Sequence, residues 1–197
     1  MRRDMKRIIL AAAAFAALSF PASAQTPGAD TGLVPVAIDT SLGRIVVALD
    51  KAHAPLTTAN FLAYVDAHKY DGETFYRAMP TDQAGLIQGG IRDARKINKP
   101  VAYEGSDQTG VRNTAGAIAM AASAPGKAQA DFFIETRDIP GFDGPNGFAA
   151  FGHVIEGMDV VEKILAAPVS PTKGEGAMKG QMLDPPIKII KMQRVKG

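Results

Sequence analysis

The side chains that could do chemistry in this sequence are hydroxyls, carboxylates, arginines and three histidines, because the 197 residues include no cysteine. The lack of cysteine excludes a disulfide framework, thiolate zinc sites, cysteine nucleophiles and dithiol redox chemistry. His53, His68 and His153 form no His-x-x-x-His pair, so we expect surface or hydrogen-bonded histidines and predict no metal site. The Gly-x-Ser-x-Gly pattern of serine hydrolases is also missing, which leaves no recognisable nucleophile.

The N-terminus has the composition of a secretory signal. Residues 1–7 carry four positive charges and one negative charge, and residues 8–20 are uncharged. This apolar run is shorter than the roughly 20 residues that span a bilayer. Pro21 ends it, and Ala22-Ser23-Ala24 offers the small residues that a signal peptidase accepts, which predicts cleavage before Gln25. We expect a signal peptide over 1–24 and no stable membrane insertion after cleavage; an uncleaved anchor or an ordinary helix is the alternative.

The composition predicts one soluble domain without a nucleic-acid partner. Hydrophobic residues make up 46% of the chain and charged residues 21%, which suits a single packed core. The formal net charge is +2, and it becomes −1 once residues 1–24 are removed. A protein that holds nucleic acid mainly through phosphate contacts carries a larger basic excess. We expect a flexible lead-in over 25–33 and one domain over 34–197.

Short alternating strands dominate the domain. Residues 34–40 and 44–50 alternate with period two around Gly43, which predicts a β-hairpin. Apolar residues at spacings of three and four predict one helix that starts near Pro55 and a second over 158–165. Further strands are predicted over 74–78, 86–88, 117–121, 131–136, 149–154 and, after Pro185-Pro186, 187–195. Two widely separated helices favour an antiparallel barrel or sandwich over a parallel doubly wound sheet.

Five blocks then occur in a specific order. They are FYR at 75–77, LIQGG at 86–90, NTAGAIAMA at 113–121, DFFI at 131–134 and FGHVIEGMDVV at 151–161. Together they resemble the cyclophilin-type peptidyl-prolyl cis-trans isomerases, particularly the compact bacterial members exported to the periplasm. The resemblance covers 34–195 and implies a mainly β fold, a closed eight-stranded antiparallel β-barrel capped by two α-helices. It also implies a periplasmic protein without a cofactor whose partners are proline-containing unfolded or partly folded polypeptides, and nothing in the pattern requires more than a monomer.

The resemblance assigns the reaction to Arg77, which occupies the position of the family's catalytic arginine. Rotation about an amide C–N bond costs about 18–20 kcal/mol, and Xaa-Pro bonds exchange slowly without a catalyst. In the twisted state the prolyl nitrogen becomes pyramidal and gains a lone pair. An arginine donor aimed at this nitrogen stabilises the twisted state more than the planar one. Gln88 corresponds to the family glutamine that orients the guanidinium and the substrate carbonyl.

The same resemblance implies a proline pocket beside Arg77. Phe133 matches its aromatic floor, and its expected walls are Leu86, Met120 and Phe142. An apolar ring without an N–H is recognised by contact area. Ala121 and Ala122 are expected to line the groove for the substrate backbone, with Ala122 offering its main-chain groups. Plain core packing is the alternative for the four apolar side chains.

The sequence departs from the family pattern at several of these positions. Asp131 stands where a glutamine is usual, and we expect its carboxylate in the substrate groove, where it would pin Arg77 or compete with the substrate for it. Tyr76 replaces the usual histidine. Gly85 and Gly141 stand where aromatic residues are common, and Phe148 takes the place of a frequent histidine.

Two other functions stay open at this point. One is a cyclophilin-fold chaperone that binds proline-containing segments with little catalysis, which Asp131 and Gly85 motivate. The other is an unrelated β-barrel that carries a small ligand, which the number of strands motivates.

Overall fold

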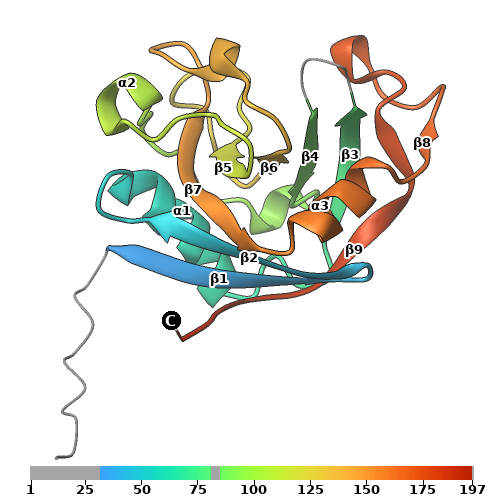
Figure 1. Cartoon of the computed structure of the whole chain (residues 1–197), viewed down its shortest axis with the longest axis horizontal. Helices are drawn as coiled ribbons and strands as arrows, with labels where there is room; N and C mark the ends of the chain where they lie inside the picture. Colours follow the sequence, from blue (N-terminus) through green and yellow to red (C-terminus); the bar gives the residue numbers. More distant parts are fainter. Residues whose placement is uncertain (1–31, 81–84, 197) are drawn as a thin grey trace, which may run out of the picture.

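The computed structural model describes residues 32–80 and 85–196. The predicted signal peptide at 1–24 and residues 25–31 of the lead-in lie outside these residues. The strands are β1 (Leu33–Thr40), β2 (Gly43–Asp50), β3 (Thr74–Pro80), β4 (Gly85–Gly90), β5 (Ala117–Met120), β6 (Phe132–Glu135), β7 (Ala149–Glu156), β8 (Val169–Ser170) and β9 (Met182–Arg194). The helices of the described residues are α1 (Pro55–Asp66), the one-turn α2 (Ser106–Thr109) and α3 (Met158–Leu165), with 3-10 turns at Ala94–Lys96, Pro140–Phe142 and Gly176–Met178 (Figure 1).

Eight of the strands close into a barrel. Their order is β1-β2-β7-β5-β6-β4-β3-β9, and β9 pairs back onto β1. Every pairing is antiparallel, and the two-residue β8 adds to the outer edge of β9. This confirms the predicted closed eight-stranded antiparallel barrel. Closure leaves no free edge in the barrel itself, which removes the usual site of strand-to-strand aggregation.

The first hairpin forms where the alternating pattern predicts it. Thr40 pairs with Gly43 across a two-residue turn, and Gly43 has φ 135°, a conformation that favours glycine. A Cβ at Gly43 would also come within 2.8 Å of Val160 on α3. The turn is therefore fixed by backbone conformation and by contact with the helix.

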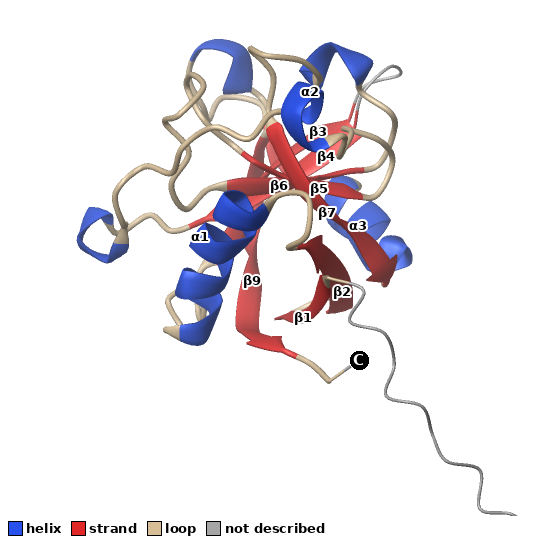
Figure 2. Ribbon diagram, turned by 90° about the vertical axis from the view of Figure 1, so that its left-hand side faces the viewer, coloured by secondary structure: helices blue, strands red, loops and turns tan. Residues whose placement is uncertain are grey.

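The two predicted helices are confirmed and lie on opposite sides of the barrel (Figures 1 and 2). Helix α1 starts at Pro55, whose fixed φ suits a first turn. Its first free N–H groups, those of Leu56 and Thr57, donate to the Glu104 carboxylate at 3.1 and 2.7 Å. Helix α3 buries Val161 and Ile164 against the barrel. The short α2 was not predicted.

Side chains fill the barrel interior. Phe61, Tyr70, Phe75, Phe132 and Phe151 form a cluster whose ring centroids are 5.2–5.6 Å apart, and all five are fully buried. Aromatic rings at these distances add to the stabilisation from burial alone. Aromatic side chains therefore occupy the interior of the barrel.

The start of the last strand differs from the prediction. Strand β9 begins at Met182 and already contains Pro185 and Pro186, whereas the sequence predicted a strand from residue 187 onward. The β3 ladder pairs with Ile187 and next with Met182, so residues 183–186 lie outside it. Proline has no N–H to donate and is tolerated where a ladder is interrupted. Strand β1 likewise begins one residue early, at Leu33, the last residue of the predicted lead-in.

Candidate active site

Arg77 lies at a bulge in β3. Phe75 pairs with Gly89 and Arg77 pairs with Gln88, so Tyr76 is the extra residue between two consecutive partners on β4. A bulge interrupts the alternation of side chains between the two faces of a strand. Tyr76 and Arg77 can therefore both reach Gln88, which two neighbours in a regular strand could not do.

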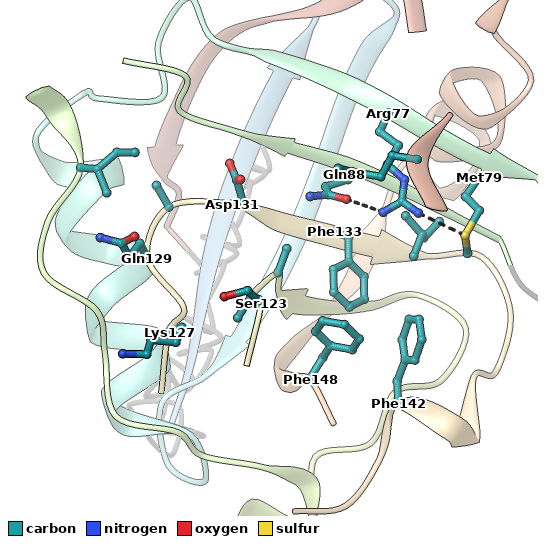
Figure 3. Close-up of a pocket in the computed structure, with 16 residues that line it drawn as sticks. Arg77, Met79, Gln88, Ser123, Lys127, Gln129, Asp131, Phe133, Phe142 and Phe148 are labelled. Atoms are coloured by element: carbon teal, nitrogen blue, oxygen red, sulfur yellow. Dashed lines mark hydrogen bonds between the residues drawn. The ribbon is translucent and has the colours of Figure 1, made fainter. Parts of the chain in front are cut away.

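Three side chains hold the Arg77 guanidinium, and Figure 3 shows two of them, Gln88 and Met79. Its Nη1 donates to Gln88 Oε1 at 2.8 Å, its Nε donates to Gln181 Oε1 at 2.8 Å, and its Nη2 contacts the Met79 sulfur at 3.4 Å. Burial lowers the pKa of Arg77, but a guanidinium stays protonated in proteins. Three of its five N–H groups are engaged, which leaves two donors without a partner among the described residues.

A cavity of about 520 Å³ opens beside the guanidinium. Its apolar side is an aromatic cluster of Phe133, Phe142 and Phe148. The centroid of the Phe133 ring lies 5.7 Å from that of Phe142 and 5.2 Å from that of Phe148, and both pairs are edge-on. Figure 3 shows the three rings gathered next to Arg77 and Gln88. A few donors beside an apolar wall form the usual pattern of a site that recognises a mostly apolar group.

The structure brings together all but one of the predicted site residues. The residues of the prediction that line the cavity are Arg77, Leu86, Gln88, Ala121, Ala122, Asp131, Phe133 and Phe142. Met120 is the exception, because it is 1% exposed and packs into the main core instead. Successive residues of β5 alternate between the two faces, so Ala119 packs toward Phe133 and Met120 packs toward the interior. Met120 also lines a second cavity.

Ala122 lines both cavities, and Ala121 lines the larger one. The Ala121 N–H donates to the Asp131 carbonyl at 2.9 Å, which ties the end of β5 to the start of β6. Within the described part of the chain, Ala122 makes no main-chain hydrogen bond. The second cavity, of about 220 Å³, shares Ala122, Ser123 and Phe148 with the first. The predicted groove residue Ala122 thus lies at both cavities, and its pairing with a substrate backbone stays a prediction.

The two glycines that depart from the family pattern do not form the cavity wall. A Cβ at Gly85 would meet the Thr136 hydroxyl and Leu165, and a Cβ at Gly141 would meet nothing within 4 Å. Met79 and Phe148 supply side chains to the wall instead. The cavity therefore keeps an aromatic and aliphatic lining despite these glycines.

Asp131 does not contact Arg77 directly. Burial raises the pKa of its carboxyl, while the positive charge of Arg92 opposes this shift. Oδ1 of Asp131 is buried without a hydrogen-bond partner among the described residues. Tyr76 is itself buried, and its hydroxyl accepts a hydrogen bond from Gln88 Nε2 at 2.7 Å. The direct pinning of Arg77 that the sequence suggested for Asp131 is therefore not present, and Arg77 is held by Gln88 and Gln181 instead.

Sequence reasoning missed Gln181 and gave Tyr76 no role. Gln181 is 104 positions from Arg77 and belongs to a polar loop without a recognisable motif, so only the closed barrel shows that the two side chains meet. Tyr76 was visible as a departure from the family pattern, but the bulge that turns it toward Gln88 leaves no signal in the sequence.

The described residues contain no group of three or more His, Asp or Glu side chains that could hold a metal ion. The histidines have other partners: His53 contacts Asp50, His68 contacts Asp71, and the half-buried His153 hydrogen-bonds Thr114 at 3.0 Å. This confirms the expectation of surface or hydrogen-bonded histidines. Within 32–80 and 85–196, no helix is long and apolar enough to cross a membrane.

Comparisons with known proteins agree with this geometry. Residues 35–194 match the family described as cyclophilin type peptidyl-prolyl cis-trans isomerase/CLD. A peptidyl-prolyl cis-trans isomerase of Acinetobacter baylyi is 37% identical over 166 residues, which cover 80% of this chain and 84% of that protein. Peptidyl-prolyl cis-trans isomerase B of Escherichia coli is 34% identical over 138 residues, 66% of this chain and 82% of that protein.

The fold of a solved structure matches as well. A cyclophilin type peptidyl-prolyl cis-trans isomerase of Cryptosporidium parvum superposes with a TM-score of 0.65 at 19% identity, covering 84% of this chain and 99% of that one. A second crystal structure of that protein, in the presence of the dipeptide Ala-Pro, superposes with a TM-score of 0.64 at 20% identity over 83% of this chain and 99% of that chain.

Proposed function

We propose that this chain, which belongs to the cyclophilin-type peptidyl-prolyl cis-trans isomerases, uses Arg77 to isomerise Xaa-Pro bonds in exported polypeptides. The isomerase activity itself follows from the family match and from relatives that carry this name. The proposal concerns the residues that perform the reaction and the compartment in which they meet their substrates. The single observation that carries it is a guanidinium held by two glutamines at the edge of an apolar cavity.

The cavity suits a proline ring. Phe133 is 2% exposed and supplies the flat apolar floor, and Leu86 and Phe142 line the same cavity. A proline ring asks for contact area and offers no N–H. Because the ring is held while the preceding residue stays in the open groove, the Xaa-Pro bond can rotate without moving the whole peptide. The Ala-Pro dipeptide of the Cryptosporidium parvum structure is the chemical class of ligand that this cavity would take.

Arg77 then acts on the rotating bond without breaking any bond. The planar amide delocalises the prolyl nitrogen lone pair, and the twisted amide frees it. The two unengaged donors of Arg77 offer an N–H to this lone pair, and they do so only when the bond is twisted. Because Gln88 and Gln181 fix the guanidinium beforehand, little reorganisation is required at the moment of reaction.

A conservative substitution tests the need for a fixed, forked donor. Arg77→Lys keeps the charge but replaces the planar fork of the guanidinium with a compact ammonium, which cannot reproduce the donor geometry toward Gln88 and Gln181. In a protease-coupled assay with an Ala-Pro peptide, we expect kcat/KM to fall by about 100-fold, the scale of losing one preorganised donor. Activity within threefold of the unaltered protein would show that a point charge is enough and would refute the proposed geometry.

The proposed compartment rests on the signal-like residues 1–24. When the full-length chain is produced in a Gram-negative host, we expect the isomerase activity in the periplasmic fraction and a mature N-terminus at Gln25. Replacement of Ala22 and Ala24 by bulky residues should block cleavage, because the peptidase accepts only small side chains there. A cytoplasmic protein that keeps Met1 would contradict the export proposal and leave the assignment of Arg77 untouched.

A further inference from the structure

Two consecutive hydrogen bonds connect Arg77 to Tyr76 through Gln88. Arg77 Nη1 donates to Gln88 Oε1 at 2.8 Å, and Gln88 Nε2 donates to the Tyr76 hydroxyl at 2.7 Å. Gln88 and Tyr76 are 8% and 7% exposed, so water competes little for either bond.

The donor capacity of Arg77 fixes the direction of both hydrogen bonds. A guanidinium can only donate, so Gln88 must turn its carbonyl oxygen toward Arg77. The amide nitrogen of Gln88 then points the other way and needs an acceptor, which the Tyr76 hydroxyl oxygen provides. The Gln88 amide, which could otherwise turn either way, is thereby held in one orientation.

We propose that Tyr76 is a positioning residue of the isomerase, whose hydroxyl holds the Gln88 amide in the orientation that fixes the Arg77 guanidinium. Tyr76 does not line the cavity and so does not meet the substrate. Its effect passes through Gln88 alone. The proposal rests on the proposed role of Arg77.

A purely structural role for Tyr76 makes a different prediction. The Tyr76 ring is buried, and the Arg92 guanidinium lies 4.8 Å from its centroid. These contacts belong to the ring and persist in Tyr76→Phe, which removes only the hydroxyl. A loss of activity in this variant therefore reports the hydrogen bond to Gln88 and not the packing of the ring.

The test is Tyr76→Phe in the isomerase assay on an Ala-Pro peptide. We expect kcat to fall about tenfold with KM within twofold, because a loosened guanidinium weakens stabilisation of the twisted state without changing the proline pocket. Tyr64→Phe is the matched control, since it removes a tyrosine hydroxyl that accepts from the Asn98 N–H at 2.8 Å and that bonds neither Arg77 nor Gln88. Its kcat should stay within twofold of the unaltered protein.

The double variant separates action through Gln88 from any other effect. In a Gln88→Ala background, Tyr76→Phe should cause no further fall in kcat, because the amide that it orients is gone. Equal falls in both backgrounds, or an unchanged kcat in Tyr76→Phe, would overturn the proposal. Arg77→Ala, measured alongside, must lose activity; if it does not, the proposed function has failed and not only the role of Tyr76.

Discussion

Glu135 should make the free energy of unfolding of this protein depend on pH. Its side chain, at the end of β6, is fully buried, and neither carboxyl oxygen has a hydrogen-bond partner among the described residues. Burial, followed by the charges of Asp143 and Asp138, raises the pKa of Glu135 from 4.5 to about 8. A buried carboxyl without donors stays protonated because its ionised form cannot be solvated.

The raised pKa makes the protein less stable as the pH rises. Below pH 4.5 both the folded and the unfolded chain hold the proton, so Glu135 has no effect on the free energy of unfolding. Between 4.5 and 8 the unfolded chain ionises while the folded chain keeps its proton, which costs about 1.4 kcal/mol per pH unit. At pH 7 this amounts to about 3 kcal/mol, and above pH 8 the cost levels off.

Glu135→Gln removes this cost and keeps the shape of the side chain. We expect urea unfolding at pH 7 to show a variant more stable by about 3 kcal/mol, and at pH 5 a difference of less than about 1 kcal/mol. Isomerase activity should not change, because Glu135 does not line the cavity. A difference between the two proteins that is the same at pH 5 and pH 8 would refute the reasoning, since it would show that the folded state ionises Glu135 at its ordinary pKa.

Three further variants test separate parts of the structure. Glu104→Gln should lower the free energy of unfolding at pH 7 by about 1–3 kcal/mol in urea, because its carboxylate accepts the Leu56 and Thr57 N–H groups at the start of α1; an unchanged midpoint would show that α1 needs no such partner. Phe133→Leu should raise KM for an Ala-Pro peptide several-fold with kcat nearly unchanged, because the floor of the proline pocket loses contact area; the reverse split would place Phe133 in the chemical step. Gln181→Ala should lower kcat about tenfold with KM unchanged, because Arg77 Nε loses its 2.8 Å partner; steady-state kinetics that match the unaltered protein would remove Gln181 from the site.

Local periodicity predicted the elements that depend on neighbouring residues. The apolar spacing predicted α3 with the bounds that the structure has, and Gly43 marked the first hairpin. Periodicity failed where distant segments decide the outcome. Pro185 lies inside β9 because the β3 ladder is interrupted beside it, and the N-terminus of α1 is completed by Glu104 from a loop 47 and 48 residues away. Neither pairing leaves a trace in the local pattern.

In the candidate site, too, the sequence predicted some residues and missed those that depend on distant segments. The sequence blocks predicted that Arg77 and Gln88 lie together, and the β3–β4 ladder places them opposite each other. Met120 was expected in the pocket wall because the family resemblance implied it. The period-two rule of a strand, applied to β5, would have turned it toward the core. The contact of Gln181 with Arg77 and the bulge at Tyr76 depend on how β3 pairs with β4 and β9. The sequence blocks alone do not describe these pairings.

The most direct test of the account is to measure binding and isomerisation separately in Arg77→Ala. Two-dimensional NMR exchange on an Ala-Pro peptide gives the rate of cis–trans interconversion, and titration of the same sample gives Kd. We predict that the variant binds the peptide with a Kd within about threefold of the unaltered protein, because the Phe133 pocket is intact, while catalysed exchange falls at least about 100-fold. A rate of catalysed exchange within tenfold of the unaltered protein would contradict the central claim. A loss of peptide binding as large as the loss of rate would also contradict it, because Arg77 would then stabilise the bound ground state and not the twisted bond.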